Sequence, residues 1–176
     1  MLIYNQAFDF YHTIFRMLQL TSKGLNNIQI EKIRILDFYM VFPWTLLDIP
    51  HKTRWFKGYQ KILYKEKNSY DNLPNTRQMF IKMAPYQYQA LKAIVAFGFY
   101  DKEAFENGLV KKTEKVIPPQ LIDKIIEANK NKEEFLTMLT SRFAEIPLLG
   151  SMGLKARTGL MDFKYDETTN STSQIN

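Results

Sequence analysis

Cysteine is absent from this 176-residue sequence, and histidine is almost absent, with only His12 and His51. Without cysteine the chain forms no disulfide and no thiolate metal site. The two histidines lie far apart and lack the spacing that places two metal ligands on one helix face. No serine lies in a G-x-S-x-G elbow, and the carboxylates are scattered along the chain. We therefore expect no metal site, no cofactor and no catalytic residue, so the sequence does not predict an enzyme.

Long apolar runs are missing as well. The stretch IVAFGFY follows Lys92 closely and ends before Asp101, so no run approaches the roughly 18 residues that a membrane span needs. The sequence shows no secretory signal pattern either, and we expect a soluble, cytoplasmic protein. Hydrophobic residues make up 45% of the chain, with 13 Phe and 10 Tyr. This is enough apolar surface for one folded domain with a continuous core.

The chain has an excess of positive charge. Its formal net charge is +6, and residues 1–100 carry 13 basic but only 6 acidic side chains. In the stretch RWFKGYQKILYK, helical periodicity brings four basic residues into one narrow arc, opposite aromatic and aliphatic residues; they are Arg54, Lys57, Lys61 and Lys65. We expect an amphipathic helix whose basic stripe faces outward and contacts DNA or an acidic partner. Ordinary solvated surface is an equally good interpretation.

Helical periodicity dominates the rest of the sequence. A first helix is expected from Asn5, with Arg16 and Gln19 on its solvent face. The stretch IEKIRILDFYMVF is apolar nearly all round and predicts a buried helix that ends at Pro43. Its two interior charges, Arg34 and Asp37, are expected to form a structural ion pair. Two further helices are predicted after Pro118 and Pro119 and from about Glu133 until Pro147.

Strand signals are few. The alternation in RQMFIKM favours a strand, after which a helix would begin at Pro85 and stop at Gly98. Asn107-Gly108 is a hairpin-turn signal between two segments of strand-like composition. The predicted fold class is therefore α+β but mainly α: a compact helical domain, residues 1–147, with a winged-helix or kite-like hairpin element.

The stretch GLKARTGLM places basic residues between two glycines. A Walker loop would need lysine directly after its second glycine, but Leu154 separates Gly153 from Lys155. We expect residues 148–166 to form a flexible C-terminal arm that docks on a partner subunit; an arm packed on its own domain is an equally good interpretation. Residues 167–176 are polar and are expected to be a disordered tail. The docking residues of the arm would be Leu154, Lys155, Arg157, Thr158, Leu160 and Met161.

Four blocks of the sequence resemble, in their content and order, the middle component of bacterial ABC three-component systems, the class that includes Lamassu-type defence. These blocks are YNQAFDFYHTIFRML, IRILDFYMVFP, LPNTRQMF and IPLLGSMGLKARTGLM. The resemblance spans nearly the whole chain, and none of the blocks is a catalytic signature. It implies a small non-enzymatic subunit that joins an SMC-like ABC ATPase to an effector, often a nuclease. The resulting hetero-oligomer would sense phage or plasmid DNA.

Two functions are therefore compared. The leading hypothesis is an accessory subunit of an anti-phage complex, with DNA contact through the complex or through the basic stripe. The alternative is a free-standing winged-helix transcriptional regulator that binds DNA as a dimer. A hydrolase would need active-site groups that the sequence does not offer.

Overall fold

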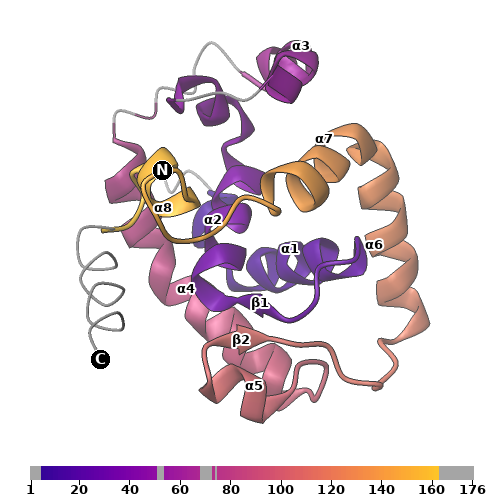
Figure 1. Cartoon of the computed structure of the whole chain (residues 1–176). Coiled ribbons are helices and arrows are strands. Elements are labelled where there is room, and N and C mark those ends of the chain that lie inside the picture. Colours follow the sequence, from indigo (N-terminus) through magenta and orange to yellow (C-terminus); the bar gives the residue numbers. More distant parts are fainter. Residues whose placement is uncertain (1–4, 51–53, 68–72, 74, 163–176) are drawn as a thin grey trace, which may run out of the picture.

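The structure is a computed structural model that describes residues 5–50, 54–67, 73 and 75–162. Helices dominate it (Figure 1). The α-helices are α1 (Phe10–Ser22), α2 (Ile30–Val41), α3 (Gln60–Lys65), α4 (Thr76–Ala96), α5 (Lys102–Glu106), α6 (Pro119–Asn131), α7 (Glu133–Thr137) and α8 (Leu154–Thr158). Short 3-10 helices are η1 (Gln6–Phe8), η2 (Pro43–Asp48) and η3 (Arg54–Tyr59), and a π-helical turn, η4, spans Met138–Phe143.

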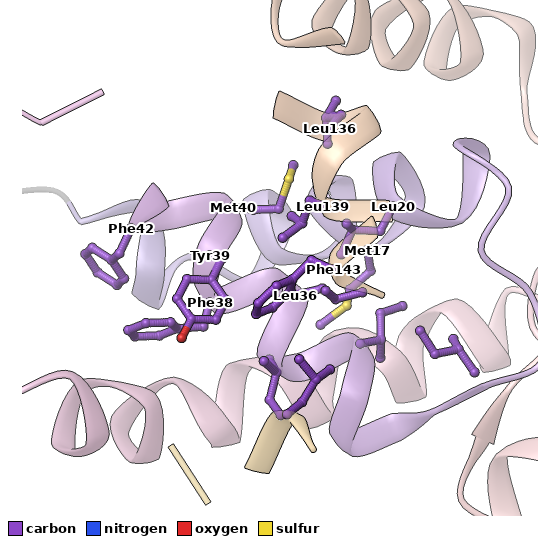
Figure 2. Packing of buried hydrophobic residues seen from close by; sticks show 14 of the residues in the cluster. Met17, Leu20, Leu36, Phe38, Tyr39, Met40, Phe42, Leu136, Leu139 and Phe143 are labelled. Atoms are coloured by element: carbon purple, nitrogen blue, oxygen red, sulfur yellow. The ribbon is translucent and has the colours of Figure 1, made fainter. Parts of the chain in front are cut away.

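Helix α2 forms the centre of the core. Its residues are buried almost without a break from Ile33 to Met40, as its apolar composition predicted. Helices α1 and α4 pack against it and against each other, and α6 packs on α1. Figure 2 shows side chains of α1, α2, α7 and η4 that meet in this cluster; it labels Met17, Leu20, Leu36, Phe38, Tyr39, Met40, Leu136, Leu139 and Phe143.

Helix α1 corrects one prediction from the sequence. Arg16 and Gln19, which were expected to face solvent, are buried, whereas Tyr11 is exposed. The amide of Gln19 donates to Asn129 Oδ1 of α6 at 3.0 Å, and Asn129 in turn donates to Ser22 at 2.8 Å. Polar side chains can occupy a buried helix face when partners on other helices complete their hydrogen bonds, so periodicity alone gave the wrong face.

A buried polar network, formed by Arg16, Asp37, Gln87 and Arg34, joins α1, α2 and α4. Asp37 is fully buried, and its partner is Arg16, whose Nε lies 2.6 Å from Asp37 Oδ1. Gln87 donates to Asp37 Oδ2 at 2.9 Å and to the backbone carbonyl of Arg34 at 3.1 Å. The predicted pair of Arg34 with Asp37 is therefore wrong. Arg34 instead donates to Gln87 Oε1 at 3.0 Å.

Helix α4 corrects a second prediction. The expected strand at residues 77–83 is the first part of α4, whose N-cap is Asn75, and Pro85 lies inside the helix instead of in its first turn. Phe80 and Met83 are buried in the core while Pro85 is exposed. Burial of that helical face outweighs the hydrogen bond that proline cannot donate. The predicted stop at Gly98 is confirmed, because Gly98 has φ +79° directly after the helix.

The strands are very short. β1 (Ile28–Gln29) pairs antiparallel with β2 (Leu109–Val110), so that Ile28 lies opposite Val110. A further antiparallel bridge joins Tyr100 to Lys112. The chain does fold back here, but the predicted two-residue turn at Asn107-Gly108 is wrong. The helix α5 fills the connection, and Gly108, with φ +78°, follows the C-cap of that helix. The predicted class, α+β and mainly α, is confirmed.

The two predicted late helices are confirmed in outline. Helix α6 begins at Pro119, and α7 begins at Glu133. The last part is not regular α-helix, since η4 continues α7 with π-helical geometry up to Phe143. Phe143, the last residue of η4, is buried. The carbonyl of the next residue, Ala144, accepts a hydrogen bond from Lys32 of α2 at 2.9 Å. This contact ties the later helices to the centre of the core.

We predict that Asp37→Ala lowers the free energy of unfolding by about 3–5 kcal/mol, because Arg16 is then left buried without a counter-charge. Asp162→Ala is the matched control: Asp162 also pairs with an arginine, Arg77, at 2.8 Å, but both side chains are exposed. Its loss is expected to cost about 0–1 kcal/mol. Chemical denaturation measures both. Equal costs for the two variants would contradict a structural role for the buried pair.

Candidate functional site

The basic face, which we define as Arg54, Lys57, Lys61 and Lys65, lies on η3 and α3. All four side chains are exposed. On the opposite side Phe56 and Leu63 are fully buried and hold the segment against the core. The outward orientation is therefore confirmed, although residues 54–59 form a 3-10 helix where a continuous α-helix was expected. Its binding to DNA or to an acidic partner stays a prediction.

The charges of the basic face are not neutralised within the described part of the chain. None of the four side chains forms an ion pair with a described carboxylate. The nearby Glu66, at the C-cap of α3, pairs at 3.7 Å with Lys132, between α6 and α7. Figure 1 shows α3 at the edge of the molecule, away from α5 and the strands. The basic face is thus available to an anionic surface.

The C-terminal segment, residues 148–162, packs into the domain's own core. Leu148, Leu154 and Leu160 are buried in the main hydrophobic cluster. Backbone bonds fold the segment on itself, since Leu154 N donates to the carbonyl of Pro147 at 2.8 Å. Gly153 sits so close to the preceding turn that an added Cβ would lie 2.2 Å from the carbonyl oxygen of Leu149. The rest of the expected arm and the expected tail, residues 163–176, lie outside the described residues.

The polar residues of this segment also have internal contacts. Lys155 is only 6% exposed, and its Nζ lies 3.2 Å from Glu31 Oε1 of α2. The half-buried Arg157 and Thr158 line a cavity of about 90 Å³, and Arg157 Nε donates to the carbonyl of Met152 at 2.5 Å. Docking through these residues stays a prediction. In this conformation Leu154, Leu160 and Lys155 serve the chain's own packing, and Met161 keeps part of its surface exposed.

A larger cavity, which we call the α2–α4 pocket, has a volume of about 370 Å³. It lies between α2, α4 and the C-terminal segment and is lined by Glu31, Arg34, Arg77, Phe80, Ile81, Ala84, Lys155, Leu160, Met161 and Asp162. Sequence reasoning missed this site. Its lining comes from three separate stretches of the chain, and Arg34 had been assigned to Asp37.

Arg34 is buried and lines the α2–α4 pocket, and no described carboxylate forms an ion pair with it. It is 7% exposed, and its guanidinium carbon lies 4.9 Å from the centre of the Phe80 ring and 4.5 Å from that of Tyr88. Its Nη1 also donates to the hydroxyl of Tyr88 at 3.0 Å. Burial lowers the pKa of Arg34, because the charged form has lost part of its water shell.

The described residues meet neither the requirements of a metal site nor those of a membrane-spanning helix. Among them no group of three or more His, Asp or Glu side chains could hold a metal ion. None of the described helices has the length and apolar character needed to cross a bilayer.

We predict that Gly153→Ala lowers the free energy of unfolding by about 1–3 kcal/mol, since the new methyl group must displace backbone. Gly58→Ala is the control, because no atom lies within 4 Å of the Cβ it would add. Thermal denaturation of both variants measures the difference. An unchanged Gly153→Ala variant would contradict the tight packing of the segment.

The buried leucines of the C-terminal segment lead to a prediction for truncation. We predict that a chain ending at Gly150 is destabilised as a whole, because it lacks Leu154 and Leu160 from the core. Urea denaturation, followed by circular dichroism and compared with a chain ending at Asp162, measures this loss. Equal denaturation midpoints would show that the segment is a separate arm.

Comparison with known proteins places most of the chain in a described family. Residues 2–166 match a family model described as ABC-three component (ABC-3C) system Middle Component 5. No curated protein and no solved structure matches the chain. The matched residues include the basic face, the α2–α4 pocket and the whole C-terminal segment.

Proposed function

The chain belongs to the middle component 5 family of ABC-three component systems, and from this premise we propose that it bridges an SMC-like ABC ATPase and a nuclease-type effector. Membership of the family makes it an accessory subunit of such a system. The proposed complex is a cytoplasmic, Lamassu-type defence assembly that acts against phage or plasmid DNA. The subunit itself is proposed to be non-catalytic.

The basic face is the main structural observation that supports this proposal. Four exposed cations follow one another along η3 and α3, and the described carboxylates leave them unpaired. Anchoring by Phe56 and Leu63 fixes the segment that presents them. A fixed array of like charges attracts an anionic surface with little loss of conformational entropy. DNA held by the ATPase, or an acidic region of the ATPase itself, has the required charge.

We predict that replacing all four basic-face residues with Glu weakens assembly with the ATPase or binding of the complex to DNA. The matched control changes four exposed lysines elsewhere to Glu, namely Lys111, Lys112, Lys124 and Lys130. Co-purification from cells that express all three components of the system measures assembly. Titration of a 24-base-pair duplex at several salt concentrations measures DNA binding. Each lost phosphate contact should reduce the slope of log K against log salt by about 0.9.

The same experiment separates two functions. A free-standing regulator would purify alone as a dimer and bind a palindromic duplex without the other components. An accessory subunit would co-purify with them in a fixed stoichiometry. Wild-type protein that associates with neither component would overturn the bridging role, and equal effects of the two fourfold variants would reduce the basic face to solvated surface.

A further inference from the structure

The α2–α4 pocket contains a charge that no described residue balances. Three cations line it, and two of them are paired: Arg77 with Asp162 at 2.8 Å and Lys155 with Glu31 at 3.2 Å. Arg34 is the third. No described carboxylate lies within ion-pair distance of its guanidinium; Glu31 and Asp37 act on it only from farther away.

This imbalance is costly for a side chain that is more than nine-tenths buried. The two aromatic rings and the oxygens of Gln87 and Tyr88 replace part of the lost water. None of these groups carries a full negative charge. A buried guanidinium whose fork is only partly used is a strong site for a carboxylate, which it can bind through two parallel hydrogen bonds.

We propose that the α2–α4 pocket receives an acidic side chain from a partner subunit, with its carboxylate against Arg34. The walls suit the aliphatic stem of such a residue, because Ile81, Ala84 and Leu160 are apolar. The volume of about 370 Å³ accommodates one side chain with its flanking backbone. Buried arginines that meet a carboxylate in a desolvated pocket are frequent energetic centres of protein interfaces.

The charges at the pocket favour a protein segment over nucleic acid. Glu31 and Asp162 line the same pocket, and both side chains are exposed to solvent. They would repel the neighbouring phosphates of a DNA strand, whose charges recur at short intervals. A single carboxylate adds only one negative charge near these two groups, and basic residues on the rest of its segment would offset that repulsion. That the occupant comes from a partner subunit rests on the proposed function.

The pocket can be tested without any partner. N-acetyl-glutamate N-methylamide is titrated into the ¹⁵N-labelled full chain while the Arg34 Nε–H resonance is followed, and N-acetyl-glutamine N-methylamide serves as the neutral isostere. We expect the glutamate compound to bind at least about tenfold more tightly, as befits a charged hydrogen bond. Arg34→Lys, which keeps the charge but loses the fork, should weaken the binding.

A second variant avoids any risk to folding. Ile81 is 57% exposed and lines the α2–α4 pocket, so Ile81→Asp should abolish glutamate binding through repulsion. Ile126 on α6 is 60% exposed and lies outside this pocket, so Ile126→Asp is the matched control and should leave binding unchanged. In cells that express the whole system, Ile81→Asp should likewise lose a partner subunit that Ile126→Asp retains.

Several results would overturn the inference. They are equal affinity for the glutamate and glutamine compounds, binding that survives Ile81→Asp, and tighter binding of inorganic phosphate than of the glutamate compound. A chain ending at Asp162 that binds the glutamate compound far more tightly than the full chain would make the chain's own following residues the occupant. If the chain binds the glutamate compound but no partner subunit co-purifies with it, the inference about the pocket holds and the proposed bridging function is wrong.

Discussion

One buried carboxylate, that of Asp37, holds the three central helices in register. It accepts from Arg16 of α1 and from Gln87 of α4 while it projects from α2. Gln87 also binds the α2 backbone and Arg34, so four polar residues form one connected hydrogen-bond network. Apolar burial is non-directional, whereas the hydrogen bonds of the buried carboxylate restrict how the three helices are oriented. The α2–α4 pocket, whose walls come from two of these helices, depends on this arrangement.

Local signals in the sequence were sufficient for part of the fold. The buried character of α2, the stop at Gly98, the start at Pro119 and the outward basic face were predicted from composition and periodicity, and the structure confirms them. These features depend on the residues of a single element. A helix with apolar residues on every side must be buried, and a stripe of charge must face solvent.

The errors concern residues whose environment comes from elsewhere in the chain. Arg16 was placed in solvent because its partner Asp37 lies 21 positions away. Residues 77–83 were assigned to a strand because short alternation does not distinguish a strand from a helix that is buried on one face. The α2–α4 pocket could not be predicted at all, since three separate stretches build it. Glycines around basic residues are compatible with a docking arm and with a tightly packed turn. Which of the two forms depends on whether the core of the domain has room for the leucines of the segment.

The place of the C-terminal segment in the core has a consequence for the timing of assembly. Leu154 and Leu160 follow every other described core element in sequence, so they leave the ribosome after α1 to α7. Until they emerge, the hydrophobic core formed by the earlier helices lacks these two side chains and is incomplete. The α2–α4 pocket, whose wall includes Leu160 and Met161, forms at the same late moment. A nascent or prematurely ended chain therefore lacks the pocket.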